Sequence, residues 1–245
     1  VITARDVDNV YEIPLLFHEQ GVLSLLNKEL GLAAKPDLAE WSGLVETMRK
    51  ASNGLNIAIC GKYTALEDSY ASVVEALCHA GAANNVKVNI NWVDTEDVVS
   101  VQDARNLLDG CHGVIVPGGF GSRGIEGKIK VVEYCRKNDV PYLGLCYGLQ
   151  LAVIEFMRNV CGKSGAHTTE VDPRSSTPVI AILPDKKDLK NMGGTLRLGA
   201  YDAILEKGSL AHKLYTTQKV SERHRHRYEV DPRYHDVLQE HGLAI

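Results

Sequence analysis

From Gly54 to the end of the chain, short apolar runs alternate with longer amphipathic stretches. A short apolar run that ends at glycine or proline predicts a buried strand, and apolar side chains at helical spacing predict a helix. The sequence therefore predicts strands at residues 55–60, 86–92, 113–116, 141–146 and 177–183, and helices at 67–80, 101–108, 125–137 and 150–158. Such repeated βα units imply an α/β fold, with a mostly parallel open sheet flanked by helices.

The first part of the chain has a different pattern. Apolar spacing predicts helices at residues 15–30 and 38–49, with the helix-breaking sequence Lys-Pro-Asp at 35–37 between them. Residues 51–54, Ala-Ser-Asn-Gly, have the composition of a linker. We therefore expect residues 1–53 to connect to a preceding domain, and residues 54–245 to form one α/β domain.

Composition and charge narrow the classes of function. The chain has 245 residues, of which 44% are hydrophobic, enough for a sizeable core. A net charge of -4 gives no basic footprint for nucleic acid or an anionic membrane surface. The six cysteines form no C-x-x-C pair, so we expect free thiols and no metal site. No membrane span or signal peptide is visible, so the expected location is cytoplasmic.

The motif Gly144-Leu145-Cys146-Tyr147-Gly148 follows the fourth predicted strand. Small residues two before and two after a nucleophile allow a sharp turn from strand to helix, a nucleophile elbow. The N-terminus of the following helix favours the thiolate, so Cys146 is predicted to be the most acidic and reactive of the six thiols. The alternative is a buried cysteine that happens to lie between glycines.

A glycine-rich loop, Pro117-Gly118-Gly119-Phe120-Gly121, follows the third predicted strand. The N–H groups of Gly119 and Tyr147 are predicted to form an oxyanion hole for a tetrahedral intermediate. A phosphate-binding loop is a second possibility, although the G-x-x-x-x-G-K-[ST] pattern is absent. A tight βα turn without a chemical role is a third.

Residues 222–230, Glu-Arg-His-Arg-His-Arg-Tyr-Glu-Val, are unusually rich in arginine and histidine. A solvated charge run is the common explanation for such a stretch. Metal binding through His224 and His226 is another, but the positive charge of three arginines opposes a cation. The arginines are also suited to hold a substrate carboxylate in a planar fork.

Taken together, five stretches resemble the class I glutaminase domain of the CTP synthase family. They are residues 117–121, 144–150, 168–170, 192–199 and 222–230, and they occur in the family's order. Residues 6–15 resemble the close of that family's synthetase domain, and residues 35–49 resemble its interdomain linker. The resemblance implies a class I glutaminase (flavodoxin-like) fold for residues 54–245 and the end of a synthetase domain plus a linker for residues 1–53.

By this resemblance, Cys146 attacks the side-chain amide of L-glutamine, forms a glutamyl thioester and releases ammonia. Gly119 and Tyr147 would hold the oxyanion. The implied glutamine-binding residues are Gly119, Tyr147, Gly148, Leu149, Gln150, Glu170 and Arg227, of which Arg227 and Glu170 match the carboxylate and amino ends of the substrate.

The resemblance also implies the setting of the reaction. Ammonia would pass to a synthetase domain of the same polypeptide, which uses ATP and Mg to aminate UTP to CTP, with GTP as an activator. That domain would also form a homo-oligomer, a tetramer, and the glutaminase domain itself would need no cofactor. Residues Met192–Gly199 match a lid involved in the activation by GTP, and a plain surface loop is the alternative.

The chain departs from the family pattern in three ways. Tyr147 replaces the usual Leu after the nucleophile, and Leu149 replaces the usual Met. The family's catalytic His and Glu belong to an H-P-E motif. None of the nine histidines here is followed by Pro-Glu, so we expect that motif beyond Ile245. Two other functions remain open: a catalytically silent module for effector binding and assembly, and an α/β-hydrolase with a cysteine nucleophile.

Overall fold

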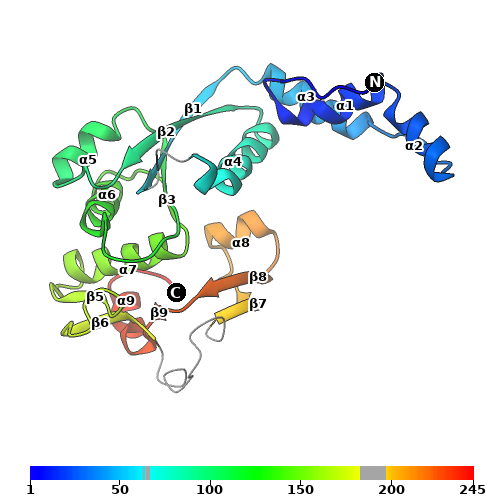
Figure 1. Ribbon diagram of the computed structural model, residues 1–245. Coiled ribbons are helices and arrows are strands. Elements are labelled where there is room, and N and C mark those ends of the chain that lie inside the picture. The colour runs from blue at the N-terminus through cyan, green and yellow to red at the C-terminus, as the bar shows by residue number, and fades with distance from the viewer. Residues whose placement is uncertain (63, 65–66, 183–196) are drawn as a thin grey trace. The chain divides into compact units, whose positions relative to one another are not determined.

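The computed structural model describes residues 1–62, 64, 67–182 and 197–245. The chain divides into two compact units, and their elements are labelled in Figure 1. Unit 1 comprises Val1–Ile57 and Asp68–Ile90, and unit 2 comprises Ala58–Glu67 and Asn91–Ile245. The limit between a connector and a catalytic domain at residue 53 stays a prediction.

Unit 1 is mostly helical. Its elements are η1 (Val10–Glu12), α1 (Ile13–Glu19), α2 (Val22–Leu30), α3 (Ala39–Lys50) and α4 (Ala71–Ala83), with η2 (Glu67–Tyr70) leading into α4. The prediction of one helix over residues 15–30 is wrong, because Gly21 takes a left-handed φ of 73° that ends α1 and begins α2. The helix predicted at residues 67–80 also has different limits, because α4 begins at Ala71 and continues past Gly81 to Ala83. A Cβ there would lie 2.7 Å from the Val86 carbonyl oxygen, so this glycine permits a close chain approach inside the helix.

The central sheet has four strands in the order β2-β1-β3-β4. They are β1 (Gly54–Gly61), β2 (Lys87–Asp94), β3 (Gly113–Val116) and β4 (Tyr142–Gly144). β3 and β4 are parallel, with Val116 paired to Gly144 at their carboxyl ends. The helices that follow the strands of unit 2 are α5 (Val101–Leu107), α6 (Ile125–Lys137) and α7 (Tyr147–Asn159). The predicted α/β fold with a mostly parallel, helix-flanked sheet is confirmed.

The carboxyl-terminal part of unit 2 contains two further sheets. The first has the order β5-β6-β9, from Ala166–Thr168, Thr177–Ala181 and Glu229–Val230, and the second is the antiparallel hairpin of β7 (Arg197–Ile204) and β8 (Lys219–His226). The remaining elements are α8 (Leu210–Tyr215), η4 (Pro232–Tyr234) and α9 (His235–Glu240). Residues 222–230 therefore form the end of β8, the connection to β9 and all of β9. The sequence of this stretch shows no clear strand or helix periodicity.

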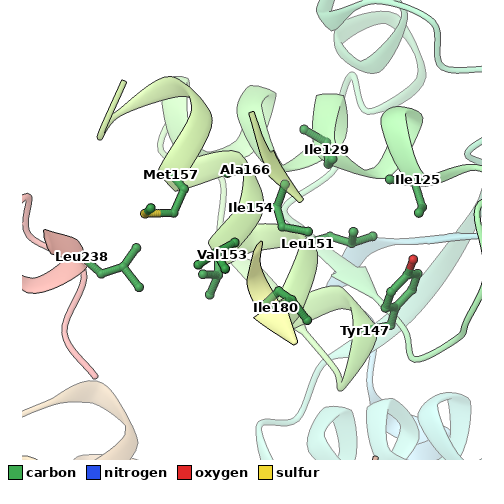
Figure 2. Close-up of a cluster of buried hydrophobic side chains, with 11 residues drawn as sticks. Ile125, Ile129, Tyr147, Leu151, Val153, Ile154, Met157, Ala166, Ile180 and Leu238 are labelled. Atoms are coloured by element: carbon green, nitrogen blue, oxygen red, sulfur yellow. The ribbon is translucent and has the colours of Figure 1, made fainter. Parts of the chain in front are cut away.

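Two apolar clusters hold unit 2 together. One lies between the sheet and helices α5 and α6, and includes Cys60, Val116 and Val131. The other surrounds α7, the helix that follows the nucleophile motif, as Figure 2 shows. Leu151 and Ile154 of α7 are completely buried there. Because such burial is worth roughly 1.5–3 kcal/mol for each large side chain, α7 is firmly fixed on the fold.

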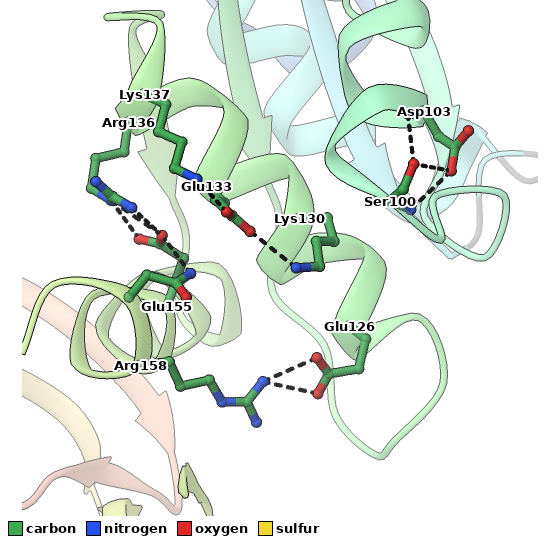
Figure 3. A network of polar contacts seen from close by, with 10 residues as sticks. Ser100, Asp103, Glu126, Lys130, Glu133, Arg136, Lys137, Glu155 and Arg158 are labelled. Carbon is green, nitrogen blue, oxygen red and sulfur yellow. Dashed lines mark hydrogen bonds and ion pairs between the residues drawn. The ribbon is translucent and has the colours of Figure 1, made fainter. Parts of the chain in front are cut away.

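Charged side chains fix α7 on another side (Figure 3). Arg136 of α6 forms a two-pronged ion pair with Glu155 of α7, with Nη2 2.7 Å from Oε1 and Nε 2.9 Å from Oε2. The Glu155 side chain is only 1% exposed. Arg158 of α7 reaches back to Glu126 of α6. The orientation of α7 matters because its N-terminus carries the candidate nucleophile.

Candidate active site

Cys146 sits on a strained turn between β4 and α7. Its φ of 52° and ψ of -101° lie outside the common regions for a residue with a side chain. A Cβ on Gly144 would lie 2.5 Å from the Leu149 nitrogen, and a Cβ on Gly148 would lie 2.0 Å from the Val116 oxygen. Both flanking positions therefore require glycine. The structure confirms the predicted elbow and corrects the local limits: β4 ends at Gly144, and α7 begins at Tyr147.

The acidity of the Cys146 thiol differs from the sequence-based prediction. Cys146 is exposed, yet the protein atoms around its sulfur desolvate the thiolate and raise the pKa of the thiol above its ordinary value. The main-chain N–H of Tyr147 bonds to the sulfur and lowers the pKa, and the charge of Glu170 raises it. The prediction of an unusually acidic thiol is therefore wrong in this structure, because desolvation outweighs the hydrogen bond from the Tyr147 N–H.

Cys146 opens onto a pocket of about 500 Å³. The residues that line it come from the glycine-rich loop, the elbow and the start of α7, the turn after β5, the end of β8 and the β8–β9 connection: Gly119, Phe120, Cys146, Gln150, Glu170, Arg225, His226, Arg227 and Tyr228. Five residues chosen from the sequence thus meet in one place. Leu149 lines a neighbouring pocket of about 530 Å³, and Tyr147 and Gly148 are buried behind the elbow.

Three side chains hold the glycine-rich loop. Glu170 Oε1 accepts a hydrogen bond from the Gly121 N–H at 2.9 Å. The Tyr147 hydroxyl donates to the Gly121 carbonyl at 2.9 Å. The Lys62 ammonium donates to the Phe120 carbonyl at 2.5 Å and also lies over the Phe120 ring. These bonds fix the backbone next to Gly119, the residue predicted to donate to an oxyanion.

The pocket residues that sequence reasoning missed lie mostly at the end of β8 and in the β8–β9 connection. Gln150 Nε2 donates to the Tyr228 carbonyl at 2.8 Å. His226 Nδ1 donates to the same oxygen at 3.0 Å, and His226 Nε2 lies 3.0 Å from His224 Nδ1. Both ring nitrogens of His226 are therefore engaged in holding the chain around Arg227. The unusual composition of residues 222–230 was the available signal for these roles.

The rival interpretation of this stretch as a metal site gains no support. Among the residues that the structure describes, no three His, Cys, Asp or Glu side chains come together as ligands. The described helices also include none with the length and apolar character that crossing a membrane requires. The proposed lid motif, Met192–Gly199, lies largely outside the described residues, which resume at 197.

A buried cation lies behind the glycine-rich loop. The Lys128 side chain is 1% exposed, and its ammonium is 5.7 Å from the centre of the Tyr147 ring. Burial, with a smaller contribution from Lys62, lowers the pKa of Lys128 to about 8. Lys62 and Lys128 thus both lie next to the glycine-rich loop, and positive charge there suits a substrate that develops negative charge.

This lysine should reduce the stability of the fold at neutral pH. Below pH 8 the ammonium is charged in both states, and the difference from an ordinary pKa of about 10.4 corresponds to a cost of about 3 kcal/mol. From pH 8 to about 10.4 the folded state loses its proton first, so stability rises with pH. Lys128→Met should therefore raise the free energy of unfolding by up to about 3 kcal/mol at pH 7, and by much less at pH 10.

Denaturant titrations at the two pH values measure this difference. Lys163→Met, at an exposed lysine, is the matched control and should change little at either pH. A Lys128→Met protein that is less stable than the parent at pH 7 would show that the ammonium has a favourable partner in the native state.

Comparison with known proteins adds independent support. The sequence matches the family "Glutamine amidotransferase class-I" over residues 65–245. It is 50% identical to the CTP synthase of Methanocaldococcus jannaschii over 252 residues and 48% identical to that of Pyrococcus furiosus over 246 residues. These alignments cover 100% of this chain but 46% and 45% of the two relatives, so the chain spans about half the length of the curated relatives it matches.

A solved structure with the same fold is the Trypanosoma brucei CTPS glutaminase domain with bound acivicin. The TM-score is 0.70 at 41% sequence identity, over 77% of this chain and 72% of that chain. The fold, the elbow and the family match define the class: the chain belongs to the class-I glutamine amidotransferase family. Within that class, it is similar to the glutaminase domains of CTP synthases. The resemblance seen in the motifs is confirmed, and the α/β-hydrolase alternative is wrong.

Proposed function

We propose that this chain is the glutaminase part of a CTP synthase and that Cys146 is its nucleophile. The observation that carries the proposal is the position of Cys146: a strained elbow places it at a pocket where Gln150, Glu170 and Arg227 meet. The substrate that suits this pocket has a carboxylate at one end, an ammonium group beside it and an amide carbonyl that reaches the sulfur. L-Glutamine has all three.

Each residue has a separate task in binding. Arg227 pairs with the α-carboxylate of glutamine, because a guanidinium matches a carboxylate with two parallel hydrogen bonds. Glu170 receives the α-ammonium group while it holds Gly121. Gln150 fixes the Tyr228 carbonyl and so shapes the wall beside Arg227.

The chemical step then occurs at the side-chain amide. The Cys146 sulfur adds to the amide carbon, and the carbonyl electron pair moves to oxygen, where the N–H groups of Gly119 and Tyr147 stabilise it. When the pair returns, the C–N bond breaks, and nitrogen leaves as ammonia after it gains a proton from a general acid. Water then hydrolyses the thioester to glutamate and restores the thiol. Because burial raises the pKa of Cys146, the first step needs a base.

In the complete protein, we propose, a synthetase part uses this ammonia with ATP and Mg²⁺ to convert UTP to CTP, under activation by GTP. The synthetase part also forms a homotetramer, and the enzyme is cytoplasmic. The names of the relatives and the larger length of their chains support a synthetase part that makes CTP. In this proposal, ATP and Mg²⁺ bind to the synthetase part.

The direct test supplies the complete protein with glutamine, ATP, Mg²⁺ and UTP and measures CTP and glutamate together. One glutamate should form for each CTP, and GTP should increase the rate with glutamine. Synthesis of CTP from ammonium salts with no release of glutamate from glutamine would support the catalytically silent module instead.

Arg227→Lys should raise the KM for glutamine by roughly ten-fold or more, because lysine keeps the charge but loses the planar fork. The kcat should change much less, since the carboxylate is bound equally in the ground state and the transition state. Arg105→Lys, at an exposed position of helix α5 that lines neither pocket at Cys146, is the matched control. Melting curves of both proteins exclude a general loss of stability. An unchanged KM in Arg227→Lys would remove this arginine from the site.

A further inference from the structure

The side chain of Tyr147 has no role in the chemistry described so far. Only its main-chain N–H belongs to the oxyanion hole. Yet the side chain is 2% exposed and lies directly beneath the glycine-rich loop, with ring atom Cδ1 3.8 Å from the place where a Cβ on Gly119 would be. Figure 2 shows the ring at the N-terminal end of α7. The ring thus fills the space between the elbow and the loop.

The phenol hydroxyl makes a specific bond as well. It donates to the Gly121 carbonyl at 2.9 Å, while the N–H of the same glycine donates to Glu170. Gly121 has a φ of 76°, a conformation that glycine adopts without strain. Because glycine has no side chain, it makes no side-chain contact that would fix this turn. Side chains from two other segments determine where Gly121 lies.

Tyr147 also contacts the nucleophile through its main chain. The main-chain N–H of Tyr147 contacts the Cys146 sulfur, and its side chain holds the loop that carries Gly119. Tyr147 therefore connects the two halves of the oxyanion hole, one through its backbone and one through its hydroxyl. A leucine or a phenylalanine at this position cannot make the second connection.

We propose that the Tyr147 hydroxyl is a positioning group that locks the glycine-rich loop against the nucleophile elbow, and so sets the spacing of the two oxyanion donors. This inference rests on the proposed function, since it concerns the tetrahedral intermediate of glutamine hydrolysis. The hydroxyl transfers no proton. Burial raises the pKa of the phenol above its ordinary value, so the group remains a donor throughout the working pH range.

Tyr147→Phe in the complete enzyme tests the inference, because it removes the hydroxyl and keeps the ring. The kcat for glutamine hydrolysis should fall roughly 3- to 10-fold, the range expected for loss of one neutral hydrogen bond. The KM should remain within about two-fold, because the donors strengthen their contact only as negative charge develops. Synthesis of CTP from ammonium salts should be unchanged.

Tyr142→Phe is the matched control. The Tyr142 hydroxyl also donates to a backbone carbonyl, that of Gly148 at 2.8 Å, but this carbonyl lies in helix α7 and not in the loop. Loss of that bond should lower the melting temperature about as much as Tyr147→Phe does. The kcat of Tyr142→Phe should stay within about two-fold of the parent.

Two inactivators separate positioning from general damage to the elbow. A glutamine-analogue chloroketone is attacked at its carbonyl, so its reaction with Cys146 passes through an oxyanion before sulfur displaces chloride. Iodoacetamide is attacked at carbon with direct loss of iodide and needs no oxyanion. In Tyr147→Phe the chloroketone rate should fall by the same factor as kcat, and the iodoacetamide rate should be unchanged.

An unchanged kcat, or an equal fall in both inactivation rates, would overturn the inference. A Tyr142→Phe protein with the same loss of kcat as Tyr147→Phe would overturn it too. If the parent enzyme hydrolyses no glutamine, the proposed function fails, and the ratio of the two inactivation rates still decides whether the hydroxyl positions the loop.

Discussion

Cys146→Ala should abolish CTP synthesis from glutamine in the complete enzyme and leave synthesis from ammonium salts intact. The thioester cannot form without the sulfur, so the loss should reach the assay background, whereas supplied ammonia bypasses the step. The elbow itself should survive, because alanine is smaller than cysteine and the glycines at 144 and 148 still relieve the close contacts. Parallel assays with glutamine and with ammonium chloride measure both outcomes.

The same prediction extends to chemical labelling. A glutamine-analogue electrophile should modify Cys146 before any other cysteine, since Cys146 lines the pocket that would bind the analogue. Cys78 is the matched control, because it is also exposed but lies in unit 1. Equal labelling of the two would mean that solvent exposure alone directs the reagent. Cys78→Ala should retain full activity with glutamine.

A polypeptide of these 245 residues should hydrolyse glutamine far more slowly than one that continues through an H-P-E motif. A positioned base contributes about 10²–10⁴-fold, and it also protonates the departing ammonia. The raised pKa of Cys146 makes this contribution more necessary, because little thiolate exists at neutral pH without a base. Glutamine turnover of the two polypeptides, at equal concentration of titrated Cys146, measures the difference.

Equal turnover would place the base within residues 1–245. His224 and His235 would then be the first positions to replace, since both line the pocket next to Cys146. His226 lines it too, but both of its nitrogens are already engaged. His167, which lies in β5, lines neither pocket. Its Nδ1 accepts from the Thr168 N–H, so it is a poor candidate.

Several features were determined by local sequence. The α/β alternation appears because each buried strand is a short apolar run and each helix has apolar residues at helical spacing. The elbow could be predicted because Gly144 and Gly148 leave no room for a Cβ, a requirement that lies entirely within five residues. Helix α6 was predicted at its observed limits, 125–137, and the glycine-rich loop after β3 was recognised from residues 117–121.

Local sequence failed where two signals compete. Gly21 lies within an apolar pattern that predicts one helix, but its left-handed conformation divides the segment into α1 and α2. Gly81 lies where a helix commonly ends, but the close approach of Val86 explains the glycine, and α4 continues. In both cases the apolar pattern alone does not show which constraint acts on the glycine.

Only the tertiary structure decided how the pocket is assembled. Residues 119, 146, 170 and 227 are far apart in the chain, and no local pattern determines that the β8–β9 connection folds back to the elbow. The acidity of Cys146 is also a tertiary property, since desolvation by surrounding groups outweighs the hydrogen bond from the neighbouring Tyr147 N–H. The bond from Tyr147 to Gly121 joins residues 26 positions apart. Sequence determines the elements and the chemistry they can offer, whereas distance and burial, which depend on the whole fold, determine which groups act together.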